Sequence, residues 1–98
     1  MDKPPKIAIL LSTYNGSAYL AEQLDSLLTQ TYSNFVILIR DDGSTDSTEE
    51  IISRYVEKNQ EKIYRLSGNQ DNVGPSASFF LLIQYIMREK DSLRFSHV

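Results

Sequence analysis

The sequence has 98 residues, which is enough for one small domain and too few for two. With 41% hydrophobic and 23% charged residues it lies outside the disordered and fibrous classes, and no apolar stretch is long enough to span a membrane. A net charge of -3 without a basic stripe argues against a nucleic-acid partner, and the lack of cysteine excludes disulfides and thiolate metal sites, which fits a reducing compartment.

The first half of the chain alternates between two hydrophobic patterns. Residues 6–11 consist of Lys6 and a continuous run of five apolar residues, which predicts a strand buried on both faces. From Ser17 the apolar residues recur at helical spacing, which predicts a helix that buries Leu20, Leu24, Leu27 and Leu28. A second apolar run, residues 35–39, is short and rich in β-branched residues, so it predicts a second buried strand.

The second half continues this alternation. After the turn formers of residues 40–47, apolar residues at positions 51, 52, 55 and 56 predict a second helix. Residues 62–67 predict a weaker third strand, and residues 68–74 predict a loop. Pro75 suits the first turn of an apolar third helix from about Ser76 to Arg88, and residues 93–98 are expected to begin a fourth strand.

This order of elements predicts the α/β class, with an open, mostly parallel sheet between two layers of helices. In such sheets ligands bind beyond the carboxyl ends of the strands. The loops at residues 12–17, 41–47 and 69–75 are therefore expected to line one crevice.

The first of these loops offers two interpretations. Ser12, Thr13, Tyr14 and Asn15 directly follow a buried strand, and they suit a nucleobase that stacks on the tyrosine while short polar groups contact its edge. Alternatively, Asn15 begins a simple turn and helix cap, and Tyr14 packs on a neighbour.

The second loop carries two adjacent carboxylates, Asp41 and Asp42, which are costly at a strand end unless they meet a donor or a cation. Asp42 would accept hydrogen bonds from a base N–H or from ribose hydroxyls, or the pair would take Mg²⁺. In the structural alternative, Asp41 pairs with Arg40 or another cation, and Asp46 caps the next helix.

Four segments in order carry a resemblance to a known family. They read KIAILLSTYN at residues 6–15, LDSLLTQTY at residues 24–32, DDGSTD at residues 41–46 and NVGPS at residues 72–76. Together they closely resemble the start of family 2 glycosyltransferases. The resemblance implies a GT-A fold with a Rossmann-like three-layer αβα first half. It also implies an inverting enzyme that transfers a sugar from a nucleotide diphosphate sugar, most often a UDP or dTDP sugar, to a glycan or lipid-linked acceptor.

The resemblance also implies roles for individual residues. It makes Ser12 and Tyr14 contacts to the base, with Thr13 and Asn15 supporting that loop. It makes Asp42 the partner of the imino N–H of the base and Asp41 a neighbour that shapes the loop. Asn72 and Gly74 match the segment that passes near the ribose and the diphosphate.

The sequence departs from the family where the metal ligands are expected. In the family an Asp-x-Asp motif at the end of the next strand holds Mg²⁺ or Mn²⁺, whereas residues 92–98 here read SLRFSHV. The catalytic base of the family lies further downstream. Residues 1–98 are therefore expected to be the N-terminal, nucleotide-sugar-binding half of a glycosyltransferase domain, without catalytic residues or metal ligands and inactive alone. A cytoplasmic location is expected, including the inner face of the membrane.

Three further expectations follow. Because the family places its fourth strand beside the first, residues 7–11 should form an exposed apolar edge, and a homodimer is expected to assemble by pairing through this edge or by swapping the terminal segment. A non-catalytic nucleotide-binding module on the same fold stays open as an alternative. A receiver-like phosphoacceptor domain is disfavoured, because its acidic pair would follow the first strand and not the second.

Overall fold

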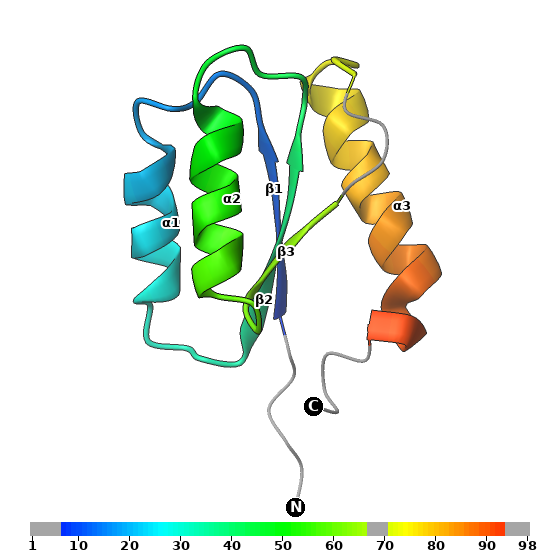
Figure 1. Cartoon of the computed structure of the whole chain (residues 1–98). Helices are drawn as coiled ribbons and strands as arrows, with labels where there is room; N and C mark the ends of the chain where they lie inside the picture. Colours follow the sequence, from blue (N-terminus) through cyan, green and yellow to red (C-terminus); the bar gives the residue numbers. More distant parts are fainter. Residues whose placement is uncertain (1–6, 67–70, 94–98) are drawn as a thin grey trace, which may run out of the picture.

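The computed structural model describes residues 7–66 and 71–93. In this part of the chain three strands alternate with three helices: β1 Ile7–Thr13, α1 Leu20–Leu28, β2 Phe35–Asp41, α2 Thr48–Lys58, β3 Ile63–Arg65 and α3 Pro75–Leu93. The strands are parallel in the order β1-β2-β3. Figure 1 shows α1 and α2 on one face of the sheet and α3 on the other. The predicted three-layer α/β fold is confirmed.

The central strand β2 is buried along its whole length because helices cover both faces of the sheet. Successive side chains of a strand point to opposite faces. Phe35, Ile37 and Ile39 face α1 and α2, where they join a core cluster with residues 20, 24, 51, 52 and 63. The intervening residues 36, 38 and 40 face α3. This alternation decides which side chains of the following loop meet.

The structure changes the predicted bounds of four elements, β1, β2, β3 and α1. Both β1 and β2 run two residues further, to Thr13 and Asp41, because their pairing continues that far. β3 spans only residues 63–65, although the Lys62 carbonyl still accepts from the Ile37 N–H and the Leu66 N–H donates to the Ile39 carbonyl. α1 begins at Leu20 and not at Ser17, after a turn in which the Gly16 carbonyl accepts from the Leu20 N–H.

The third helix is longer than predicted. It continues to Leu93, so that the prediction of a strand beginning at this residue is wrong. Residues 76–92 contain neither glycine nor proline, so nothing in the sequence interrupts the helix before that point. The rest of the predicted fourth strand, residues 94–98, lies outside the described residues. Within the described part of the chain, no helix combines the length and the apolar character needed to cross a bilayer.

Candidate functional site

The first two polar loops leave the sheet side by side. The strand register pairs Ser12 with Arg40 and Thr13 with Asp41. One residue further, the Asp42 N–H donates to the Thr13 carbonyl across 2.8 Å. The polar residues after β1 and β2 therefore meet at the carboxyl edge of the sheet, where ligands of parallel sheets bind.

Asp41 is fully buried and faces α1 and α2. Its carboxylate accepts hydrogen bonds from the Thr13 hydroxyl (2.8 Å), the Ser44 N–H (2.8 Å) and the Ser44 hydroxyl (2.6 Å). These contacts hold the end of β1 and the loop after β2 together. The structural alternative that paired Asp41 with Arg40 is wrong, because Arg40 forms its ion pair with Asp42, the residue on the same face of the strand.

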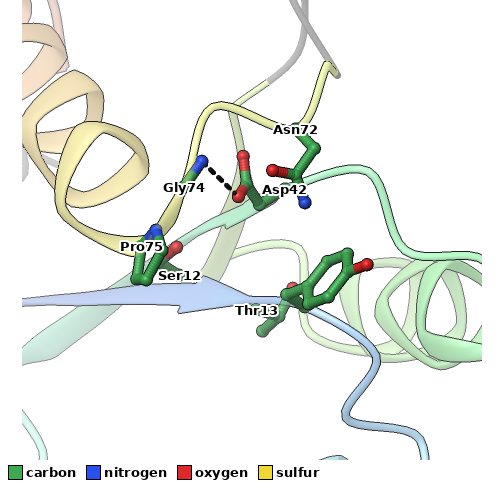
Figure 2. A pocket seen from close by; sticks show the side chains of 7 residues that line it. Ser12, Thr13, Asp42, Asn72, Gly74 and Pro75 are labelled. Carbon is green, nitrogen blue, oxygen red and sulfur yellow. Dashed lines mark hydrogen bonds between the residues drawn. The ribbon is translucent and has the colours of Figure 1, made fainter.

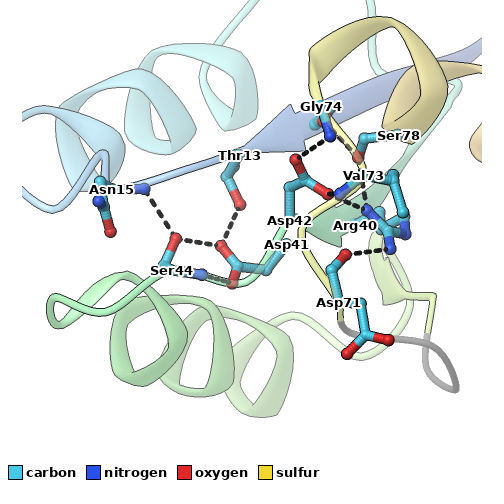
Figure 3. A network of polar contacts seen from close by, with 11 residues as sticks. Thr13, Asn15, Arg40, Asp41, Asp42, Ser44, Asp71, Val73, Gly74 and Ser78 are labelled. Atoms are coloured by element: carbon cyan, nitrogen blue, oxygen red, sulfur yellow. Dashed lines mark hydrogen bonds and ion pairs between the residues drawn. The ribbon is translucent and has the colours of Figure 1, made fainter.

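Asp42 points to the opposite side, towards the start of α3, and is 2% exposed. One carboxylate oxygen, Oδ1, accepts from Arg40 Nη1 (2.8 Å) and from the Val73 N–H (2.8 Å). The other, Oδ2, accepts from the Gly74 N–H (3.0 Å). Figure 3 shows the two acids turning away from each other into separate clusters of partners.

The partners of Asp42 decide its charge. Burial alone raises the pKa of this carboxyl group, but the hydrogen bonds from Val73, Arg40 and Gly74, together with the charge of Arg40, lower it more, so the pKa lies below its ordinary value. Asp42 is therefore a carboxylate at neutral pH and acts as a hydrogen-bond acceptor only.

Gly74 owes its place to its backbone conformation. Its φ is +94°, in the region that favours glycine, and a Cβ added here would have nothing within 4 Å. The requirement is therefore conformational and not one of space. In this conformation the N–H of Gly74 reaches Asp42, and its carbonyl accepts from the Ser78 N–H (2.9 Å) in the first turn of α3.

The first loop is tied to the second by Asn15. Its N–H donates to the Ser44 hydroxyl (2.7 Å), and its side-chain oxygen accepts from the Thr45 N–H (2.8 Å). Asn15 itself has a φ of +50°, a left-handed conformation that asparagine tolerates better than most residues. Next to it, the Gly16 N–H donates to the hydroxyl of Thr48 (2.9 Å), at the start of α2.

A hollow of about 290 Å³ opens where the three loops meet. This volume is close to the lower end of the range typical of small-molecule sites, roughly 300–1,000 Å³. Figure 2 shows how side chains from the ends of β1 and β2 and from the start of α3 surround it. Its lining consists of Ser12, Thr13, Tyr14, Asp42, Asn72, Gly74 and Pro75. The Tyr14 side chain is about half exposed, at 51%.

The acids of the described residues do not form a metal site. All the oxygens of Asp41 and Asp42 accept hydrogen bonds from hydroxyls, backbone N–H groups or Arg40. In residues 7–66 and 71–93, histidines, aspartates and glutamates nowhere gather in a group of three that could hold a metal ion. The described oxygens of the two aspartates thus serve as acceptors for donors of the protein itself.

Six of the eight predicted site residues line the hollow, namely Ser12, Thr13, Tyr14, Asp42, Asn72 and Gly74. Asn15 and Asp41 do not line it, and they instead hold the surrounding loops. Sequence reasoning missed Pro75 in the lining and Arg40 and Ser78 behind it. Arg40 did carry a signal, because it directly follows the apolar run of residues 35–39 and lies two positions from Asp42, hence on the same face.

Comparison with known proteins gives a consistent result. The family model described as "Glycosyl transferase family 2" matches residues 8–87. Glycosyltransferase GlyA of Streptococcus pneumoniae is 40% identical over 73 residues, which are 74% of this chain and 10% of that protein. An uncharacterized glycosyltransferase of Nostoc sp. is 38% identical over 74 residues, 76% of this chain and 22% of its own length. The putative glycosyltransferase EpsE of Bacillus subtilis is 35% identical over 78 residues, which are 80% of this chain and 28% of that protein.

The chain thus spans between a tenth and about three tenths of the length of these relatives. Among solved structures, the mannosyltransferase PcManGT from Pyrobaculum calidifontis, in complex with GDP-Man and Mn²⁺, superposes with a TM-score of 0.73 at 20% identity. The superposition covers 85% of this chain and 25% of that structure. At this identity the likeness supports the fold.

Proposed function

Because this chain belongs to glycosyl transferase family 2, we propose that its hollow binds the nucleoside of a nucleotide diphosphate sugar, with a UDP or dTDP sugar as the donor. The sugar would pass to a glycan or lipid-linked acceptor. One observation carries the proposal: Tyr14 and Asp42, which directly follow β1 and β2, line the same hollow. These are the two groups that a base needs, an aromatic face and an acceptor at its edge.

The remaining acceptor capacity of Asp42 fits one edge of a base. Oδ1 already accepts two hydrogen bonds from protein groups, whereas Oδ2 accepts one, from the Gly74 N–H. A second hydrogen bond to Oδ2 requires a donor on the ligand. Uracil, thymine and guanine present a ring N–H at the corresponding edge, whereas cytosine presents an acceptor, which would face a carboxylate that cannot donate.

The third loop suits the part of the nucleotide beyond the base. Asn72 is exposed and brings an amide to the hollow, and Gly74 brings backbone without a side chain. We propose that this segment contacts the ribose and the diphosphate. In the described lining Asp42 is the one acid, and it is tied to Arg40, so the lining offers no second carboxylate to act as a base. These 98 residues are therefore expected to bind nucleotide without transferring sugar, and the Mg²⁺ or Mn²⁺ expected for the enzyme would need other ligands.

Calorimetric titration with UDP, dTDP, GDP and CDP, with and without Mn²⁺, tests the site. We expect binding of at least one of the first three and weaker binding of CDP. Base stacking contributes about 1–3 kcal/mol, so Tyr14→Ala should weaken binding by about 5- to 150-fold. Phe80→Ala is the matched control, because Phe80 is 55% exposed on α3 and does not line the hollow. Equal weak binding of all four nucleotides, unaffected by Tyr14→Ala, would refute the site.

We further propose that the chain forms a homodimer through β1. Among the described strands β1 pairs only with β2, so its other edge has no strand partner there. Its residues Ile7 to Leu11 carry no charge or proline that would protect such an edge, and Ile7 is 46% exposed. Two copies would pair these edges into one continuous sheet. Ala8→Lys should shift the molecular mass in light scattering towards the monomer, and a monomeric unmodified chain at high concentration contradicts the proposal.

A further inference from the structure

Arg40 occupies a position where an apolar side chain would be expected. It is 1% exposed and shares its face of β2 with the buried residues Val36 and Leu38. Burying a guanidinium costs several kcal/mol unless ion pairs and hydrogen bonds compensate for lost hydration. The contacts that compensate for the burial of Arg40 therefore indicate its role.

Those contacts converge on the wall of the hollow. Nη1 donates to Asp42 Oδ1 (2.8 Å) and to the Ser78 hydroxyl (2.8 Å), and Nη2 donates to the Asp71 carbonyl (3.0 Å). One planar group thus joins the acid at the end of β2, the third loop and the first turn of α3. In Figure 3 the guanidinium lies between these three segments.

The network extends to the first loop through Ser78. The Ser12 hydroxyl, which lines the hollow, donates to the fully buried Ser78 hydroxyl across 2.7 Å. Arg40 and Ser78 line no part of the hollow themselves. They nevertheless connect Ser12 on one wall with Asp42 on another, so that the geometry of both walls depends on a single cation behind them.

We infer that Arg40 is a positioning residue of the nucleoside site: its guanidinium orients the Asp42 carboxylate and fixes the third loop so that Oδ2 is presented to the ring N–H of the base. This inference rests on the proposed nucleotide site. It goes further in making base selectivity, and not only fold stability, depend on a residue that does not touch the ligand. Arg40 does so by occupying Oδ1, which leaves Oδ2 as the oxygen with a free lone pair.

Two readouts on Arg40→Met, with Arg54→Met as the matched control on the exposed face of α2, test the inference. The first is amide hydrogen exchange and needs no ligand. The amides of Val73 and Gly74 donate to Asp42, whereas that of Leu66 donates to Ile39. We expect exchange at Val73 and Gly74 to accelerate on the order of tenfold or more in Arg40→Met, with Leu66 much less affected, because only the first two depend on the position of Asp42.

The second readout is the ratio of UDP affinity to CDP affinity. A loss of stability alone lowers both affinities together, whereas a misplaced Asp42 lowers the ratio, which we expect to fall on the order of tenfold. Arg40→Lys should recover part of the UDP-to-CDP ratio, because the ammonium group keeps the charge beside Asp42. It cannot also reproduce the hydrogen bonds of the guanidinium to the Ser78 hydroxyl and the Asp71 carbonyl. Arg40→Lys also serves as the test if Arg40→Met does not fold.

The outcomes separate the two proposals. Failure of the unmodified chain to bind UDP, dTDP or GDP refutes the nucleotide site, whatever Arg40 does. If the unmodified chain binds, an unchanged UDP-to-CDP ratio in the folded Arg40 variants refutes the inference about Arg40 alone. Unchanged exchange at Val73 and Gly74 refutes it as well, because Arg40 then does not hold the third loop.

Discussion

Replacing Asp42 with alanine removes one acceptor from three donors, and the cost of this change can be worked out group by group. The N–H groups of Val73 and Gly74 lie in a loop that is only partly buried, so water can replace the lost acceptor. Arg40 cannot be rehydrated in this way, because it is 1% exposed. Leaving one member of a buried ion pair alone costs about 3–5 kcal/mol, so Asp42→Ala should destabilise the fold by roughly that amount.

Urea unfolding followed by circular dichroism at pH 7 measures this loss. Asp25→Ala is the matched control, because Asp25 is exposed on α1 and should cost no more than about 1 kcal/mol. Adding Arg40→Met to Asp42→Ala removes the stranded charge, so the double variant should be more stable than Asp42→Ala alone. A double variant that is no more stable, or an Asp42→Ala loss below about 1 kcal/mol, would show that the ion pair does not carry the stability assigned to it.

This prediction changes how the site should be tested. Loss of nucleotide binding in Asp42→Ala would not distinguish a missing contact with the base from a partly unfolded chain. Tyr14 avoids the problem, because its side chain is half exposed and its removal should leave stability within about 0.5 kcal/mol. Tyr14→Ala is therefore the variant whose binding data can be interpreted directly.

Three further outcomes are expected. The lowered pKa of Asp42 means that its stabilising effect is complete above the pKa of an unfolded aspartate, about 4, and is lost as the pH falls through the lower folded pKa. The urea concentration at the midpoint of unfolding should therefore fall when the pH is lowered below about 4, and it should fall less in Asp42→Asn. Gly74→Ala should destabilise by about 1–3 kcal/mol from its φ of +94° alone, as measured by urea unfolding. Ile39→Ala, at a fully buried core position, should cost about 2–5 kcal/mol by the same measurement, and a smaller loss would mean that the α1–α2 core is poorly packed.

Sequence patterns predicted the fold because its main signals are local. The apolar runs of β1 and β2 and the helical spacing of α1 and α2 each lie within one element, and their alternation then fixes a parallel sheet. The same reasoning placed the three loops at one edge. Helix and strand ends were less accurate, because they depend on tertiary pairing such as that of Thr13 with Asp41.

The contacts that the individual side chains of the site make with one another could not be predicted in this way. Both faces of β2 are apolar, so the sequence does not reveal that α3 covers the face that carries Arg40 and Asp42. The bond from Arg40 to Ser78 spans 38 residues, and that from Asn15 to Ser44 involves a loop 29 residues away. Such contacts depend on how three loops pack, and local periodicity carries no information about that packing.

The pleat of β2 also limits how the length of this strand can change without disturbing the site. Asp41 and Asp42 are neighbours in sequence yet serve opposite layers, because each step along a strand reverses the direction of the side chain. Inserting or deleting a single residue between Phe35 and Arg40 would exchange the two layers, placing the guanidinium in the apolar core beneath α1 and α2. A change of two residues would keep every side chain on its own layer. Homologous chains should therefore vary the length of this strand, if at all, in even steps.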